Sequence, residues 1–516
     1  MEKFGASFCA FLLALGFLVP FASLVGCKES EEKDEAAPAR QGAANGALET
    51  SRADAQGNAD VNKRGAPGKA SDAERGLKDF AAFGGLSDSY NKTLRDLSVS
   101  YHQAGDVASA SGKIQEAQEQ YEKALEGFAT IVEQAPDDIA AALYLCSSYN
   151  NLGALAEKQI DYAKAGENYQ KAFDVVAQVL ASAPDYTPAL QFLVNTYEGL
   201  CAVSVNAGDY AKGKEYYDKA LETQEKIVEL TPEDPDALYN LSRYYVSLFG
   251  SFKKEGADAQ AGEYLNKARE GFEKVVKLAP ENVQALRDLD VVYKNMGGSA
   301  KEDGDLKRAQ GYFEKSAAVW NKIVELAPDD PDAPADLARA YVNCGAIPTA
   351  EGDFAKAIEY NKKALEIREK LVKQTPYNVK ALRGMSLSYL SLGDLSKASG
   401  DAAQGIEYYE KGARGFKKVV ERAPGDLEEL YRLNDAYVKL AGLLLSEGES
   451  LRAKQAYSEA LAANVQIIKI APNDPAAQRF LVPTYEGLSA LAKADGDLER
   501  AEEYGKRAEE CRKKAE

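Results

Sequence analysis

The chain has 516 residues and a formal net charge of −18, because 81 Asp and Glu outnumber 63 Lys and Arg. This acidic balance argues against nucleic acid as a partner, since the phosphate backbone requires a basic surface. A single compact core is not expected at this length. One histidine and six cysteines, without a CxxC pair or zinc-like spacing, predict no metal site, and we expect no cofactor.

The first 26 residues have the composition of an export signal. Residues 4–26 are almost wholly apolar and follow Lys3. A retained membrane helix is the alternative, since 23 apolar residues are enough to span a bilayer.

The end of this segment, Leu24-Val25-Gly26 before Cys27, resembles the bacterial lipoprotein box. The resemblance implies that residues 1–26 are removed as a signal peptide and that Cys27 is lipidated as the mature N-terminus. Several acyl chains on one residue anchor a protein durably. Lys28 stands where Asp marks inner-membrane retention in that family, so the resemblance implies an exported protein at the periplasmic face of the outer membrane.

Residues 27–75 predict a lipid-anchored flexible tether. They contain no aromatic residue, and Leu48 and Val61 are their only larger aliphatic side chains. Such a segment buries too little apolar surface to offset chain entropy. Residues 76–88 predict a short capping segment over the first repeat.

Residues 89–516 repeat with a period of 48 residues. Each complete repeat ends on a proline, and a tyrosine stands 13 residues into every repeat. These tyrosines are Tyr101, Tyr149, Tyr197, Tyr245, Tyr293, Tyr341, Tyr389, Tyr437 and Tyr485. Nine copies at one fixed period indicate a repeat array whose last member is truncated. We number the positions of each repeat 1 to 48, starting after the proline.

The pattern within a repeat predicts two antiparallel helices. Apolar residues at positions 6, 9, 13 and 16 have helical spacing, and a second helical pattern ends at the proline. Position 24 is glycine in eight repeats, a turn signal, with Ile160 the exception. Asp234, Asp330 and Asp474 precede prolines as N-caps of first helices.

Three further expectations follow from this helical hairpin. The position-13 tyrosine should be buried in every internal repeat, and the Ala or Gly at position 29 should lie at a close helix contact. Pro348 and Pro483 fall inside first helices, where a proline removes a backbone hydrogen bond. We therefore expect a kink or a short break at each.

Tyr293, Met296-Gly297, Ala309, Phe313 and Pro328 resemble, in that order, the tetratricopeptide repeat. The resemblance covers residues 89–516 and implies an all-α fold, an α-solenoid of about nine antiparallel helix hairpins. Ala300 departs from the family, which has an aromatic residue there. The period of 48 also exceeds the family's 34, by about two turns in each helix, which keeps the buried faces in register.

No group of residues predicts a catalytic centre. His102 has no repeated partner, and we expect it to be solvated on a helix surface. Cys201 and Cys344 replace Gly and Leu of other repeats, which predicts small buried side chains. Because no nucleophile pairs with a base, a hydrolase is disfavoured and we predict no enzyme.

In the tetratricopeptide family the first helices line a concave groove. Positions 7, 11, 14, 18 and 21 share one face of the first helix, and position 18 is Gly or Ala in seven of nine repeats, which predicts an open floor. This face carries 11 basic and six acidic residues, although solvated helix surface is the alternative explanation. The predicted partner-binding residues are Arg243, Lys253, Arg287, Lys294, Lys301, Arg339 and Arg383.

These features predict a non-catalytic scaffold, anchored by lipid in the bacterial cell envelope, that recruits envelope proteins or peptides through the groove. A basic groove favours partners with acidic segments. The alternative is an envelope receptor for an anionic glycan or lipid, which would use the same Arg and Lys side chains.

The lipoprotein box predicts the fate of the N-terminus. Cys27→Ala should leave an unprocessed precursor, because the acylated cysteine is what the processing step recognises in that family. Mass spectrometry of the mature wild-type protein should find residues 1–26 missing and acyl chains on Cys27. A mature wild-type chain that still begins at Met1 would contradict this prediction.

Overall fold

The computed structural model describes residues 88–471 and 475–515, and these residues form 18 helices without a strand. The predicted signal peptide, Cys27, the tether and the capping segment up to residue 87 lie outside the described residues. No helix in the described ranges has an apolar stretch long enough to cross a lipid bilayer. The prediction of an all-α fold is confirmed.

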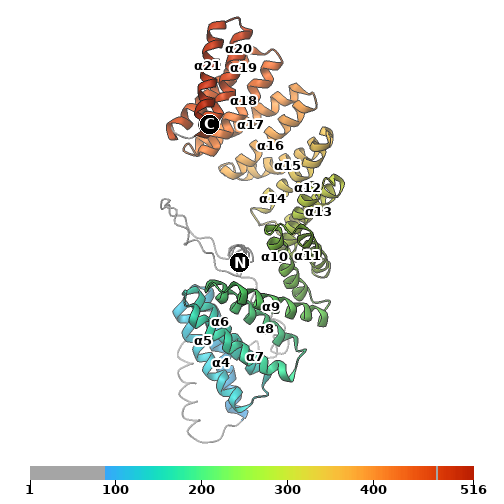
Figure 1. Ribbon diagram of the computed structural model, residues 1–516, viewed down its shortest axis with the longest axis vertical. Helices are drawn as coiled ribbons and strands as arrows, with labels where there is room; N and C mark the ends of the chain where they lie inside the picture. Colours follow the sequence, from blue (N-terminus) through green and yellow to red (C-terminus); the bar gives the residue numbers. More distant parts are fainter. Residues whose placement is uncertain (1–87, 472–474, 516) are drawn as a thin grey trace. The chain divides into compact units, whose positions relative to one another are not determined.

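The chain divides into two compact units, Met1–Pro280 and Glu281–Glu516. The described part of the first unit contains four antiparallel hairpins (Figure 1). Their helices are α4 (Asp88–Ala110) with α5 (Ile114–Gln134), α6 (Ile139–Lys158) with α7 (Tyr162–Ser182), α8 (Thr187–Asn206) with α9 (Tyr210–Leu230), and α10 (Pro235–Lys254) with α11 (Asp258–Leu278).

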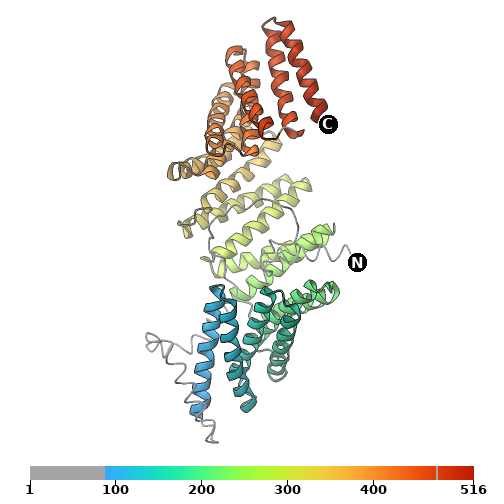
Figure 2. The same cartoon turned by 90° about the vertical axis from the view of Figure 1, so that its left-hand side faces the viewer.

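The described part of the second unit contains five hairpins. Their helices are α12 (Val283–Glu302) with α13 (Leu306–Leu326), α14 (Ala333–Glu351) with α15 (Phe354–Gln374), α16 (Val379–Ala398) with α17 (Ala402–Arg422), α18 (Leu427–Ser446) with α19 (Ser450–Ile470), and α20 (Pro475–Ala494) with α21 (Leu498–Ala515). Figure 2 shows the two helices of a hairpin side by side, for example α20 and α21. Because each hairpin also packs on the next within its unit, each unit is an α-solenoid.

The turn inside each hairpin needs a left-handed backbone at position 24. All eight glycines there have positive φ, from 71° at Gly112 to 86° at Gly400. Ile160 adopts the same conformation with φ 62°, which is costly for a β-branched residue, and its side chain is 66% exposed. The sequence prediction of a tight turn at this position is confirmed.

In most hairpins a small residue at position 17 of the first helix makes room for the side chain at position 33 of the second, with Phe249 of α10 the exception. A Cβ placed on Gly297 would lie 2.6 Å from the Phe313 ring, and one on Gly393 would lie 2.5 Å from the Tyr409 ring. Tyr409 is 1% exposed, and Ala309 at position 29 is 0% exposed. At position 29 a Cβ placed on Gly405 would lie 3.4 Å from Gly393 O of α16, which confirms the predicted close helix contact there. The interlock of positions 17 and 33 also fixes the two helices of a hairpin at close range.

The position-13 tyrosines are less buried than predicted. Tyr293 is 5% exposed, but the other eight are only partly buried. Three of their hydroxyls hydrogen-bond to the preceding second helix: Tyr245 Oη donates to Glu225 Oε1 at 3.1 Å, Tyr389 Oη donates to Glu369, and Tyr341 Oη accepts from Asn321 Nδ2 at 3.0 Å. A lysine of the hairpin's own second helix covers the ring, for example Lys267 Nζ at 5.7 Å from the Tyr245 ring centre. Tyrosine suits this place because its ring is buried while its hydroxyl remains at the surface.

One predicted N-cap and one part of the proline prediction are wrong. Helices α14 and α20 continue through Pro348 and Pro483, so the predicted breaks are absent, while a kink at either proline stays a prediction. A proline removes a single hydrogen bond, and Pro348 lies in the last turn, where its carbonyl still accepts from Asp353 N at 2.9 Å. Asp330 is also not the N-cap of α14, which begins later at Ala333, so its carboxylate is available to bind Arg287.

Truncation of tyrosine should show this difference in burial. We expect Tyr293→Ala to lower the free energy of unfolding by about 3–5 kcal/mol, the usual cost of removing a large aromatic side chain from a core. Tyr341→Ala, at the same position but partly exposed, should cost roughly half as much. Denaturant unfolding measures both changes, and a loss below about 1 kcal/mol for Tyr293→Ala would contradict the packing described above.

Candidate functional site

We call the residues at positions 7, 11, 14, 18 and 21 of the first helices the first-helix stripe. Buried residues interrupt it in α4, α6 and α8, namely His102, Leu143, Ala202 and Val205. In α12, α14, α18 and α20 all five of these positions are partly or fully exposed, whereas Leu390 interrupts the stripe in α16. A Cβ placed on Gly250 or Gly298, at position 18, would meet no heavy atom within 4 Å. Outside these interruptions the stripe is thus open to solvent and has little side-chain cover at its midpoint.

Arginines at position 7 of the stripe bind carboxylates of the next hairpin. In the second unit Arg287 pairs with Asp330, and Arg383 pairs with Glu429, whose side chain is fully buried. Arg95 pairs with Asp138 in the same way in the first unit. Burial leaves the pKa of Glu429 above its usual range, although Arg383 opposes this shift. These arginines join successive hairpins, a role that the sequence analysis missed because their partners lie in the next repeat.

The other predicted partner-binding residues have varied surroundings. Lys294 Nζ lies 2.9 Å from the buried carboxylate of Asp290, and Lys253 Nζ lies 3.0 Å from Asp258. Arg339 pairs with Asp336 one turn before it, and Arg243 lies over the Tyr239 ring at 5.9 Å. Lys301 is exposed at the end of α12 and has no carboxylate partner among the described residues.

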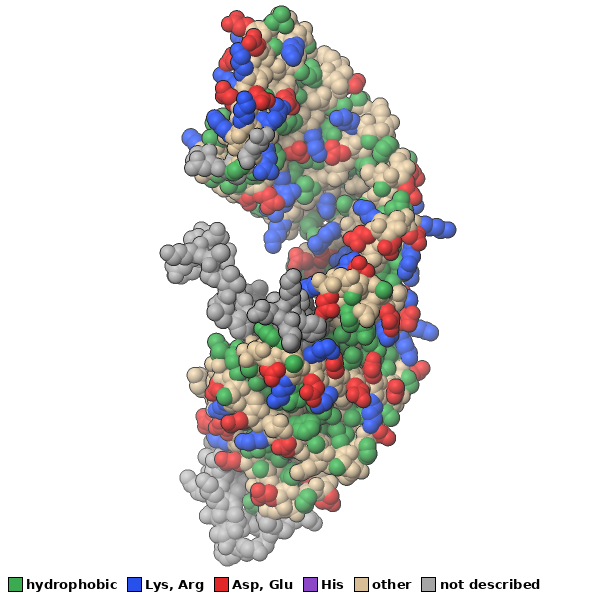
Figure 3. Space-filling model, viewed as in Figure 1, with side chains coloured by type: hydrophobic (Ala, Val, Ile, Leu, Met, Phe, Trp, Pro, Cys, Tyr) green, Lys and Arg blue, Asp and Glu red, His purple; other side chains and the backbone are tan. Residues whose placement is uncertain are grey.

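The seven predicted residues belong to two units, with Arg243 and Lys253 in the first and five in the second. Within each unit their charges are largely balanced by nearby carboxylates. In the face shown in Figure 3, Lys and Arg side chains are interspersed with Asp and Glu. A carboxylate beside a cation cancels much of the electrostatic potential that the cation produces at a distance. A partner would therefore be recognised by direct contact with these side chains and less by a long-range basic field.

The first unit has a feature that the sequence analysis did not find, a polar ladder between successive first helices. Each rung joins position 14 of one first helix to position 12 of the next. Thr196 Oγ1 lies 3.1 Å from Asn150 Oδ1 in the rung between α6 and α8. In the next rung, between α8 and α10, the Tyr244 hydroxyl donates to Glu198.

The first rung contains His102, and its predicted exposure is wrong. The side chain is 1% exposed, because α4 packs on α6 through this residue. Ser148 Oγ donates to Tyr144 O, so it accepts from His102 Nδ1–H at 3.0 Å, while Ser147 donates to Nε2 at 3.3 Å. Burial lowers the pKa of His102, and Asp106, 4.0 Å away, only partly opposes this effect. The histidine is therefore a neutral packing residue.

Two carboxyls of the first unit, Glu198 of the ladder and Glu157 of α6, have raised pKa values. Burial raises the pKa of Glu198 to about 7, although Tyr244 and Arg243 favour its charged form. Burial also raises the pKa of Glu157 to about 7, with a hydrogen bond to Tyr169 acting in the opposite direction. Both groups therefore change charge near neutral pH.

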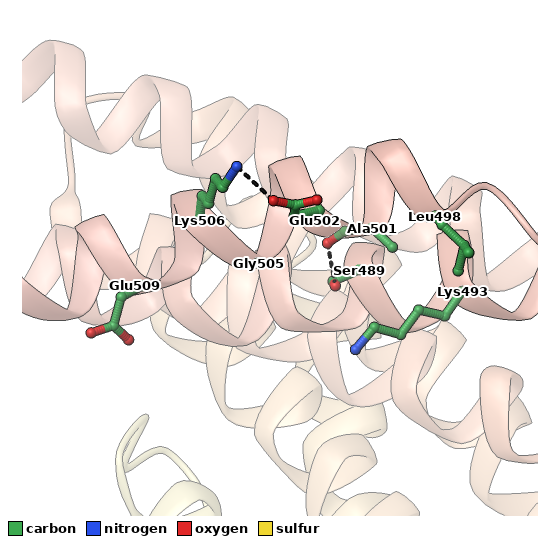
Figure 4. Close-up of a pocket in the computed structure, with 8 residues that line it drawn as sticks. All are labelled: Ser489, Lys493, Leu498, Ala501, Glu502, Gly505, Lys506 and Glu509. Carbon is green, nitrogen blue, oxygen red and sulfur yellow. Dashed lines mark hydrogen bonds and ion pairs between the residues drawn. The ribbon is translucent and has the colours of Figure 1, made fainter.

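The last hairpin has an open depression of about 440 Å³ between α20 and α21, shown in Figure 4. Gly505 stands at position 33, where other hairpins insert a large side chain. Ser489 Oγ donates to Ala501 O at 2.7 Å beside it, and Lys506 pairs with Glu502 at 2.7 Å. The depression results from this missing side chain. In the described residues no cluster of three His, Cys, Asp or Glu could hold a metal ion.

The tetratricopeptide repeat family matches three segments of the chain, residues 99–126, 203–234 and 338–371. Each segment covers helices of the stacked hairpins described above. Tetratricopeptide repeats generally mediate protein–protein interactions, and proteins with this fold are typically non-catalytic scaffolds. A search of curated proteins found no match.

Solved structures that are similar to parts of this chain include two whose names record tetratricopeptide repeats. BtubC of P. vanneervenii is 21% identical over 49% of this chain and 90% of its own, with a TM-score of 0.30. A thermophilic tetratricopeptide repeat protein of Thermus thermophilus is 19% identical over 47% of this chain and 98% of its own, with a TM-score of 0.27. A signal-transduction ATPase with a tetratricopeptide repeat sensor, from Pyrococcus horikoshii, is 16% identical over 76% of this chain and 52% of its own, with a TM-score of 0.41.

The raised pKa of Glu198 predicts a pH dependence of the first unit. Folding favours the protonated carboxyl, so its stabilising contribution is complete below its ordinary pKa of 4.5 and is lost as the pH rises through about 7. Glu198→Gln should therefore stabilise α8 by about 1–3 kcal/mol at pH 8 and have almost no effect at pH 4.

Hydrogen exchange of peptides from α8 and α10 measures this local stability. Glu229→Gln, at an exposed site on α9, is the matched control. Equal protection of wild type and Glu198→Gln at pH 8 would contradict the prediction.

Proposed function

We propose that this chain is a non-catalytic scaffold of the bacterial cell envelope, anchored by lipid at Cys27, that recruits proteins or peptides with acidic segments along the first-helix stripe. The observation that carries the proposal is the repetition of this open face in the second unit, where four of the five first helices expose all five of its positions. An extended partner can contact several hairpins at once, and many weak contacts then add up to a specific complex.

The cations at position 21 are best placed to contact such a partner. Lys301 and Lys397 are exposed at the C-terminal ends of α12 and α16, where cations are also favoured by the helix dipole. Arg287 and Arg383 are instead held by carboxylates of the next hairpin. We therefore assign Arg287 and Arg383 mainly to stacking, and Lys301 and Lys397 to partner contact.

The proposed location depends on the N-terminal sequence. The lipoprotein box at Leu24-Val25-Gly26-Cys27 supports a lipid anchor, and Lys28 supports the periplasmic face of the outer membrane. The composition of residues 27–75 supports a tether, which would let the repeats search the space near the membrane.

Charge reversal on the stripe tests the proposal. The full chain with Lys301→Glu and Lys397→Glu should capture at least about fivefold less partner from solubilised envelope than wild type, because each acidic contact becomes repulsive. Lys362→Glu with Lys418→Glu, at exposed sites on α15 and α17, is the matched control and should leave capture unchanged. Quantitative crosslinking and pull-down at low and physiological salt measure both variants.

The same pull-down distinguishes the partner classes. Loss of the captured material after protease treatment supports a protein partner. Resistance to protease combined with loss after glycan or lipid removal would replace the scaffold by a receptor for an anionic glycan or lipid. Equal capture by wild type and by the Lys301→Glu, Lys397→Glu variant at both salt concentrations would show that the stripe is not the binding surface.

A further inference from the structure

Position 40 of the second helix is uncharged in every hairpin before the last except the one that contains α15, and in the last hairpin it is the exposed Arg512. Between hairpins of one unit this residue contacts the first helix of the next hairpin, as Gln224 Nε2 does when it donates to Ala237 O at 3.0 Å. In five hairpins it is a buried apolar residue: Phe128, Val176, Phe272, Trp320 and Phe416. Gln224 and Asn464 occupy it in α9 and α19, and both are fully buried. In α15 the residue is Arg368, which places a guanidinium where the seven other hairpins before the last place an uncharged side chain.

The guanidinium of Arg368 binds α16 through one of its nitrogens. Nη1 donates to Gly384 O at 3.0 Å and to Ser388 Oγ at 2.6 Å. These two bonds use both hydrogens of Nη1. Nε and Nη2 have no partner among the described residues, and the side chain is only partly buried. The edge formed by Nε and Nη2 is therefore left to solvent.

No carboxylate in the described part of the chain neutralises Arg368. Its two acceptors, a carbonyl and a hydroxyl, are both uncharged. The neighbouring arginines already have partners, since Arg383 pairs with Glu429 and Arg339 pairs with Asp336. Burial lowers the pKa of Arg368, and the positive charge of Arg339 lowers it further. A partly buried cation without a counter-ion is an unfavourable arrangement in a packed interface.

The position of this charge relates it to the first-helix stripe. Gly384 follows Arg383 of the stripe in sequence, and Arg339 occupies the stripe on α14. The long side chain of Arg368 thus reaches from α15 to positions 8 and 12 of α16, which lie beside the stripe, and its charge is close enough to Arg339 of the stripe for the two to interact. Arg368 is absent from the predicted partner-binding residues because all of those lie on first helices.

We propose that Arg368 is an anchor for a carboxylate side chain of an acidic peptide bound on the first-helix stripe. The inference rests on the proposed function and names its specific contact. The Nε–Nη2 edge of a guanidinium matches the two oxygens of a carboxylate, and such paired bonds are stronger and more directional than a single lysine contact. A bound carboxylate would also supply the missing counter-ion.

Fluorescence anisotropy with a defined probe tests the anchor in the full chain. The probe is fluorescein-labelled deca-glutamate with an amidated C-terminus, so that only side-chain carboxylates are offered, and deca-glutamine is the uncharged control. Arg368→Met should weaken binding of deca-glutamate about tenfold, and Arg368→Lys, which keeps the charge but loses the paired bonds, about threefold. Arg414→Met, on α17 with a 64% exposed side chain, is the matched control and should change binding less than about twofold.

The outcomes separate the anchor from the wider proposal. Unchanged deca-glutamate affinity in both Arg368 variants overturns the anchor but leaves the scaffold function standing. A wild-type chain that binds deca-glutamate no better than deca-glutamine overturns both. Reduced unfolding stability with unchanged affinity would show a purely structural arginine. If Arg368→Met fails to fold, the Arg368→Lys measurement decides.

Discussion

Each hairpin in this protein can bury its apolar surface only against its own two helices and the adjoining hairpins of its unit. The interlock of Gly297 with Phe313, and of Gly393 with Tyr409, brings the two helices of a hairpin close together. The rest of the structure depends on this spacing, because it sets the distance at which the next hairpin packs. A Cβ at either glycine would clash with the ring, so the small residue is required by packing and not by the turn.

Polar contacts fix the register in which the apolar surfaces of successive hairpins pack. In the first unit the ladder of His102, Asn150 and Glu198 fixes the register of successive first helices. In the second unit ion pairs such as Arg383 with Glu429 perform the same task. Breaking such a pair is costly because the buried carboxylate would be left alone. Charged side chains that the sequence pattern assigns to partner contact can therefore join successive hairpins instead.

Periodic features of this fold could be predicted from the sequence, and features specific to one repeat could not. Helical spacing and the recurring glycine predicted the hairpins and their turns, because each repeats with the same physical cause. The burial of His102 could not be predicted, since it depends on Ser147 and Ser148 of the next repeat. The exposure of the position-13 tyrosines was also mispredicted, because a recurring aromatic residue can lie at the edge of a core as well as inside it.

The candidate site shows the same limit. The solvent-facing stripe followed from helical geometry, but the ion pairs of Arg287 and Arg339 depend on three-dimensional contacts. Arg368 could have been noticed by comparing position 40 across repeats, where a cation replaces apolar or amide side chains. Only the structure shows that Arg368 has no carboxylate partner in the described residues.

Site-specific photocrosslinking in intact cells tests the central claim, that partners bind along the first-helix stripe, most directly. A benzophenone side chain would be introduced at Gly298 or Ala346, both at position 18 of the stripe, and at the exposed Lys362 of α15 as a control. Gly298 has open space around it, so the probe can be accommodated there without repacking. The account predicts protein adducts from Gly298 and Ala346 and none from Lys362. Adducts from Lys362 alone would contradict it.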